Sequence, residues 1–180
     1  MSLRHALLGL LAVRPMSGYD LKKVIDASIG HFWSADQSQI YRTMATLVDE
    51  GLATRRTIVQ DDRPNLHEHS LTPAGRDELA RWLRSPVPQP PAREPFLMRL
   101  FFAGSLDANE VDALLTQREA EVQHLLDALT AIDIPSEPPA GVTATELILR
   151  TATRDHGIAH ARAELDWLDA TRRRLAEAAR

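Results

Sequence analysis

The 180-residue chain contains no cysteine. This absence excludes disulfides, thiolate zinc sites, iron–sulfur clusters and cysteine nucleophiles, so any metal would need histidine and carboxylate ligands. Long hydrophobic runs are also missing. None approaches the roughly 18 to 20 apolar residues of a membrane-spanning helix, and the first residues do not form a secretory leader. We therefore expect a cytoplasmic protein without a membrane partner.

Recognisable catalytic motifs are absent as well. The sequence has no Gly-x-Ser-x-Gly elbow, no glycine-rich phosphate loop and no acid pair with a third group to orient it. His156 and His160 are spaced to share one helix face, but the glutamate that follows the first histidine in zinc hydrolases is missing. They are weak candidates for a metal site, so we expect no enzyme activity, no metal and no cofactor.

Positive charge is in short supply overall, with 21 Lys and Arg against 25 Asp and Glu, a net charge of −4 and a pI of about 6.0. The two halves differ: residues 1–85 hold 11 basic and 10 acidic side chains, a net +1, whereas residues 86–180 hold 10 and 15, a net −5. Affinity for nucleic acid depends on where basic groups lie rather than on their total. The acidic total therefore leaves a DNA-binding N-terminal half open.

The first 85 residues predict three short helices, a β-hairpin and a fourth helix, in that order. Leucines at helical spacing predict a first helix that ends near Val13, before a proline. Serine with an acidic or amide residue three positions later predicts the starts of the second and third helices, at Ser17 and Ser34. Two β-leaning runs, 53–59 and 66–71, flank a turn-forming stretch. Thr72 followed by proline predicts the fourth helix, whose inward side chains should be Leu79, Trp82 and Leu83.

The stretch 86–91 holds four of the chain's 11 prolines and predicts an extended connector. We therefore divide the chain into a domain at 1–85, a linker at 86–95 and a helical domain at 96–180. Beyond the linker, a short apolar helix ends at Phe102, and Asp107 and Thr143 predict the starts of two long helices. The expected fold is mainly α-helical with a small β-hairpin: an N-terminal winged helix-turn-helix and a C-terminal long-helix, antiparallel or coiled-coil dimerisation domain.

Each long helix carries a narrow apolar seam with a period near 3.5 residues, and such a seam favours packing against another helix. We expect these seams to be too long for an isolated antiparallel hairpin to bury, which implies a homodimer. The alternative is that both seams close on the helix of Phe101 and Phe102 within a monomer. The predicted dimerisation residues are Phe101, Phe102, Leu115, Val122, Leu125, Leu129, Ile158, Leu165, Leu168 and Leu175.

The third helix has the features of a DNA-reading helix, with an apolar face to anchor it and short or bidentate polar side chains opposite. Gln39 could pair with adenine, Arg42 with guanine, and a threonine with a thymine methyl or a phosphate. A solvated helix face is the alternative for any one of them. The predicted base contacts are Ser38, Gln39, Arg42, Thr43 and Thr46. The predicted backbone and wing contacts are Tyr41, Lys22, Lys23, Arg55, Arg56, Arg63, Asn65 and His67.

These residues resemble the PadR-like family of transcriptional regulators. The resemblance is strong over residues 1–85, and the C-terminal helices look like the dimerisation part of the longer members. It implies a homodimer that binds an inverted-repeat operator and represses until a small molecule binds. The matching segments are Leu8-Gly9-Leu10-Leu11, Ser17-Gly18-Tyr19-Asp20-Leu21, Phe32-Trp33-Ser34, Gln39-Ile40-Tyr41, Leu47, Glu50-Gly51-Leu52, Arg63-Pro64-Asn65 and Ser70-Leu71-Thr72-Pro73-Ala74-Gly75.

One departure concerns the second wing strand, where similar proteins tend to carry a basic residue and a tyrosine. This chain has Leu66-His67-Glu68-His69 instead, which leaves Arg63 and Asn65 with more of the backbone contacts. As a hypothesis, His67 and His69 make DNA affinity fall as the pH rises through the imidazole range.

Two further readings stay open. A protein–protein adaptor could use the winged helix without DNA, although the arginines of the third helix and hairpin favour DNA. A small aromatic effector could stack on Trp33, Trp82 or Trp167, and Trp167 could line a cavity at the dimer interface. Core packing is the simpler role for Trp82.

Overall fold

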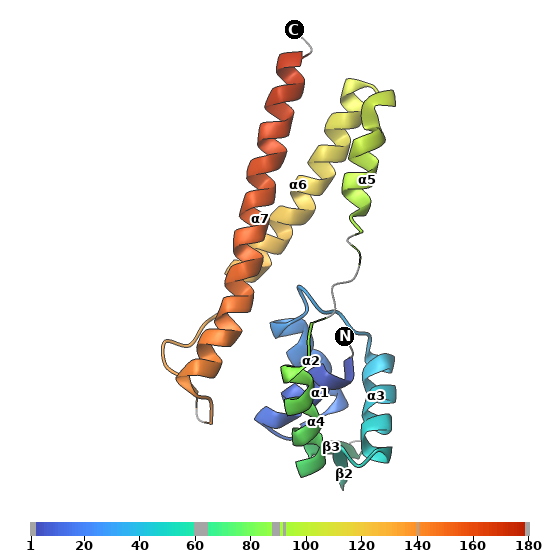
Figure 1. Cartoon of the computed structure of the whole chain (residues 1–180), viewed down its shortest axis with the longest axis vertical. Helices are drawn as coiled ribbons and strands as arrows, with labels where there is room; N and C mark the ends of the chain where they lie inside the picture. Colours follow the sequence, from blue (N-terminus) through green and yellow to red (C-terminus); the bar gives the residue numbers. More distant parts are fainter. Residues whose placement is uncertain (1–2, 60–64, 88–90, 92, 140, 179–180) are drawn as a thin grey trace. The chain divides into compact units, whose positions relative to one another are not determined.

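A computed structural model describes residues 3–59, 65–87, 91, 93–139 and 141–178 (Figure 1). The chain forms two compact units, Met1–Gln89 (unit 1) and Pro90–Arg180 (unit 2). The border between them falls inside the stretch 86–95 that the prolines single out as a linker. Among the described residues, no helix combines the length and the apolar character needed to cross a membrane.

Unit 1 packs four helices with a small antiparallel sheet, as the sequence predicts (Figure 1). The sheet has the strand order β1-β3-β2, and the two-residue strand β1 was not expected because it is too short to show a pattern. Met16 of β1 pairs with His69 of β3. The elements are α1 (Leu3–Val13), β1 (Met16–Ser17), α2 (Gly18–Ser28), α3 (Gln37–Asp49), β2 (Ala53–Ile58), β3 (Leu66–Leu71) and α4 (Pro73–Arg84).

Side-chain caps fix where the helices of unit 1 begin. The predicted cap of α2, Ser17 with Asp20, and that of α4, Thr72, are confirmed. The predicted cap of α3 at Ser34 is wrong. The N-cap is Asp36, whose carboxylate accepts a hydrogen bond of 2.7 Å from the backbone N–H of Gln39. The intervening Ala35 is buried in the core, and the cap lies two residues later than predicted.

One continuous core joins α1, α2 and α3. Helix α4 packs on α1, where the ring of Trp82 stacks on that of His5 with centroids 4.7 Å apart. Leu79 joins the core, but the inward placement of Leu83 is wrong: its side chain is 66% exposed, because it lies one residue past Trp82 and points to solvent. The core residues are Leu7, Leu8, Leu11, Met16, Leu21, Ile25, Ala35, Ile40, Met44, Leu47 and Ala53.

Unit 2 is a pair of long helices with a short helix beside them (Figure 1). The elements are α5 (Pro95–Phe102), η1 (Ala103–Ser105), α6 (Ala108–Thr130) and α7 (Ala144–Ala178). The predicted caps hold, since the carboxylate of Asp107 accepts from the N–H of Glu110 and the hydroxyl of Thr143 from that of Glu146. Helix α6 packs along α7 within the same chain.

The seams of α6 and α7 face each other, and one chain buries only part of them, so the expectation that a second copy completes their burial stays a prediction. Leu115, Val122 and Leu129 on α6 and Leu168 on α7 are buried without any second chain. The alternative, in which both seams close on the helix of Phe101 and Phe102 within a monomer, is wrong, because the side chain of Phe101 is 82% exposed and that of Phe102 67%. Ile158 and Leu165 are half-buried, whereas Leu125 and Leu175 are exposed. A dimerisation role remains a prediction for all of these residues.

Three arginines interrupt the seams, and each ties α6 to α7. Arg118 donates to both carboxylate oxygens of Glu164 at 2.7 and 3.0 Å. Arg154 donates from Nε to the backbone carbonyl of Leu129 at 2.9 Å. Arg172 bonds three α6 side chains. The interruptions are therefore polar links within the helix pair rather than breaks in it. The partners of Arg172 are Asp112, Thr116 and Glu119.

Candidate nucleic-acid interface

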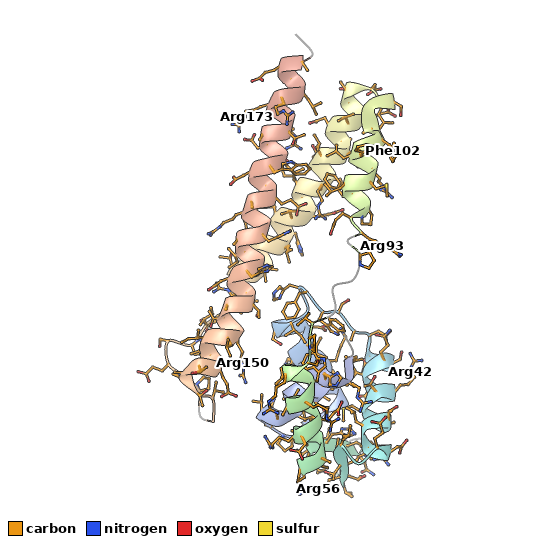
Figure 2. All side chains as sticks on the ribbon, in the orientation of Figure 1. Arg42, Arg56, Arg93, Phe102, Arg150 and Arg173 are labelled. Atoms are coloured by element: carbon orange, nitrogen blue, oxygen red, sulfur yellow. The ribbon has the colours of Figure 1, made fainter. Side chains whose placement is uncertain are left out.

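Helix α3 presents a polar face that its apolar face holds in place. Ile40, Met44 and Leu47 are buried in the core of unit 1. Residues before and between them point outward: Ser38, Gln39, Arg42 and Thr46 are exposed and Thr43 is half-buried. Figure 2 shows Arg42 projecting from α3 on the side away from α1 and α4. We call Ser38, Gln39, Arg42, Thr43 and Thr46 the reading face.

The structure adds two residues that sequence reasoning missed. A groove of about 490 Å³ runs along the reading face, and Leu3 and Arg4 at the start of α1 form part of its wall. No local pattern could have placed them there, because Arg4 and Gln39 are 35 residues apart and meet only in the fold. The groove lining includes two arginines and no acidic residue. It is lined by Leu3, Arg4, Gln39, Arg42, Thr43, Thr46 and Leu47.

The cap of α3 engages part of the reading face. The Ser38 hydroxyl donates to Asp36 at 2.7 Å, and the backbone N–H of Asp36 donates to Oε1 of Gln39 at 3.3 Å. An adenine read by both amide atoms of Gln39 would have to displace that capping bond. The bond from Ser38, and the one from the Gln39 backbone, hold the pKa of Asp36 below its usual value. A carboxylate therefore stands charged at neutral pH next to the residues predicted to read DNA.

Tyr41 packs closely on the start of α2. A Cβ added to Gly18 would lie 2.5 Å from Cε1 of Tyr41, so the ring occupies the space that any other residue at position 18 would need. The ring remains partly exposed beside the reading face. On α2, Lys22 forms an ion pair of 2.5 Å with Asp26, whereas Lys23 is exposed. Of the two lysines on α2 that are predicted to contact the DNA backbone, Lys22 thus has a competing partner in Asp26.

The hairpin of β2 and β3 carries the wing residues. Arg55 and Arg56 are exposed on β2, where Arg56 lies opposite Glu68. Figure 2 shows Arg56 at the hairpin edge of unit 1. Asn65 is exposed at the start of β3. Arg63 lies outside the described residues.

The two wing histidines have different surroundings. His67 is exposed, with Nδ1 3.2 Å from the hydroxyl of Thr57. His69 is only 5% exposed because β1 pairs with β3 at this position. Burial lowers the pKa of His69. Burial and a lowered pKa disfavour protonation of His69 against DNA, so the exposed His67 is the better carrier of that prediction.

The other singled-out side chains form no obvious site. The rings of His156 and His160 have centroids 6.3 Å apart, but the described residues include no group of three or more potential ligands able to hold a metal ion. Trp167 meets Phe96 edge to face at 6.3 Å, and the guanidinium of Arg118 lies 5.5 Å from the Phe96 ring centre. Trp167 thus braces α5 against α7.

Comparison with known proteins identifies both units. The family model described as the PadR-like transcriptional regulator family matches residues 7–81, and the model described as virulence activator alpha C-term matches residues 92–176. The probable transcriptional regulator Rv1176c of Mycobacterium tuberculosis is 32% identical over 98% of this chain and 99% of its own length. The negative transcriptional regulator PadR of Bacillus subtilis is 33% identical over 76% of this chain and 78% of its own.

Solved structures agree with these matches. Bacillus subtilis PadR in complex with operator DNA superposes with a TM-score of 0.81 and 28% identity, over 94% of this chain and 95% of that one. The Vibrio cholerae virulence activator AphA superposes with a TM-score of 0.74 and 28% identity, over 98% and 99%. The chain belongs to the PadR-like family of transcriptional regulators.

Proposed function

We propose that this regulator is a cytoplasmic, non-enzymatic homodimeric repressor that binds an inverted-repeat operator through α3 of each subunit. The observation that carries the proposal is the exposed reading face, held by the buried Ile40, Met44 and Leu47 on the opposite side of the same helix. That arrangement suits insertion into the major groove. A relative that matches nearly the whole chain, Bacillus subtilis PadR, has been crystallised with operator DNA.

The reading face and the wing would act differently. Arg42 and Thr43 are the best candidates for base contacts, because the cap of α3 already engages Ser38 and Gln39. Arg55, Arg56 and Asn65 on the hairpin, together with Arg63 and His67, would contact the backbone and fix the register. Unit 1 carries little net positive charge, so one copy alone would bind weakly. Pairing two copies at a fixed spacing multiplies the two modest affinities.

The experiment is a fluorescence-anisotropy titration with the intergenic DNA beside the gene. The full-length protein should bind in a salt-dependent way, and Arg42→Ala should weaken binding by roughly 10-fold or more, the loss expected for one bidentate base contact. Arg84→Ala removes the same charge from the exposed end of α4 and is the matched control. Absence of binding at every salt concentration would overturn the proposal.

We also propose that a small aromatic molecule relieves repression. The support is a relative, Bacillus subtilis PadR, that was crystallised with p-coumaric acid. Titrating the DNA complex with p-coumaric acid, and with non-aromatic acids of similar size as controls, should show release by the aromatic acid only. Equal release by all of the acids, or by none, would contradict this second part.

A further inference from the structure

The start of α1 lies beside the reading face, and this placement suggests a DNA contact that the helix-turn-helix pattern does not include. Arg4 shares the groove with Gln39, Arg42, Thr43 and Thr46. Two guanidinium groups therefore line a groove whose lining has no acidic residue. A groove with that lining suits an anion, and the anion that a DNA-binding helix meets in largest number is the backbone phosphate.

Arg4 has a partner in the free protein, and that partner is easy to exchange. Its Nη2 lies 2.6 Å and its Nη1 3.3 Å from the two carboxylate oxygens of Glu50, the C-cap residue of α3. The Arg4 side chain is 31% exposed and that of Glu50 41%, so solvent screens the pair and it contributes little to folding. The Arg4 Nε is buried without a hydrogen-bond partner among the described residues, so the pair does not satisfy every donor.

A phosphate offers the same two-oxygen geometry that Glu50 offers. Arginine binds carboxylate and phosphate through the same planar fork of N–H donors, so either anion can occupy it. When α3 enters the major groove, phosphates of the groove edge approach both ends of the helix. Breaking an exposed ion pair costs little, whereas each new phosphate contact releases condensed counterions.

We propose that Arg4 contacts a DNA phosphate directly, and that Glu50 holds the Arg4 guanidinium in the free protein and gives it up on binding. The inference rests on the proposed function, since it requires an operator bound through α3. It adds a contact from outside the helix-turn-helix and the wing. Arg4 would fix the register of α3 rather than read sequence.

The test uses the salt dependence of operator binding by the full-length dimer. A phosphate contact contributes a slope of about −0.9 in log K against log salt, so Arg4→Gln should flatten the slope by nearly 2 for a dimer. Affinity at low salt should fall by about 10-fold or more, whereas Arg4→Lys should keep the slope and lose less affinity. Arg81→Ala breaks another exposed Arg–Glu pair, with Glu78 on α4 and outside the groove, and should change neither.

The variant Glu50→Gln distinguishes a direct contact of Arg4 with phosphate from a purely structural role of the Arg4–Glu50 pair. If Arg4 contacts phosphate, removing its competitor should raise affinity by a few-fold. If Arg4 only positions α3 through Glu50, then Glu50→Gln should weaken binding as much as Arg4→Gln does. An unchanged slope in Arg4→Gln, or weaker binding by Glu50→Gln, would overturn the inference. Lack of operator binding by the wild-type protein would instead overturn the proposed function, so the two failures are distinct.

Discussion

Unit 1 and unit 2 differ in how they bury apolar surface. Unit 1 has one continuous core shared by α1, α2, α3 and the sheet, whereas the described part of unit 2 buries little more than the line where α6 meets α7. Most large apolar side chains of α5 stay exposed in a single chain, and α5 itself has no buried residue. Exposed apolar patches of this kind usually mark an interface. Unit 1 thus covers its apolar surface by itself, whereas unit 2 leaves the apolar side chains of α5 uncovered.

The largest effect is expected in the core of unit 1. Leu8→Ala removes a fully buried side chain and should lower the free energy of unfolding by about 2 to 5 kcal/mol. Leu83→Ala, on an exposed part of α4, is the control and should change it by less than about 0.5 kcal/mol. Urea denaturation followed by tryptophan fluorescence and circular dichroism measures both. Similar losses for the two variants would contradict the core described for unit 1.

The next largest effect concerns the exposed phenylalanines of unit 2. Burying each ring against a second copy would contribute about 1.5 to 3 kcal/mol, so Phe101→Ser with Phe102→Ser should raise the dimer dissociation constant by roughly 100-fold or more. Sedimentation equilibrium measures it, and Val87→Ser, an exposed change in the stretch 86–95, is the control. If the double variant stays as tightly dimeric as the wild type, then α5 does not form the interface.

A smaller effect should follow from the polar links in unit 2. Arg172→Gln removes contacts with Asp112, Thr116 and Glu119, and should cost up to about 1 kcal/mol, because the group is partly exposed and screened. The cost should shrink in 0.5 M salt, and the unfolding of unit 1 should not change. Differential scanning calorimetry at two salt concentrations tests this. A loss of stability that does not depend on salt would mean that Arg172 contributes through packing of its aliphatic part rather than through ion pairs.

The smallest effect is a pH dependence confined to unit 1. Burial lowers the pKa of His69, so the unfolded chain binds the proton more readily than the folded one. The stabilisation is complete above the unfolded pKa of His69 and is lost as the pH falls through its folded pKa. Thermal unfolding between pH 7.5 and 5 should show unit 1 losing stability on acidification, and His69→Gln should lessen this loss. If the variant loses as much stability on acidification as the wild type does, then a group other than His69 takes up the proton.

Local chemistry explains how much of this fold was predictable. Three of the helix starts, those of α2, α6 and α7, follow from a capping residue and a partner three positions later, and that of α4 follows from Thr72 and the proline after it, which is information within one turn. The start of α3 was missed because Ser34 with Gln37 and Asp36 with Gln39 both fit that rule, and only the burial of Ala35 separates them. The tertiary contact, not the local preference, decided the boundary.

The candidate site could likewise be predicted only where it depends on residues close together in the sequence. Periodicity identified the reading face, since a buried stripe on α3 determines which residues point outward. It could not place Arg4 in the groove, bury His69 beneath a two-residue strand, or tell a seam that pairs within the chain from one that pairs between copies. Each of these depends on residues distant in the sequence.

The contact of Tyr41 with Gly18 has a consequence for how such regulators diverge. Because the ring fills the space above Gly18, Tyr41 packs α3 against the start of α2 through a contact that involves none of the best base-contact candidates. If Arg42 and Thr43 make the proposed base contacts, substitutions there should change the preferred operator and leave this packing intact. New binding preferences could arise one side chain at a time, without rebuilding the scaffold that presents them.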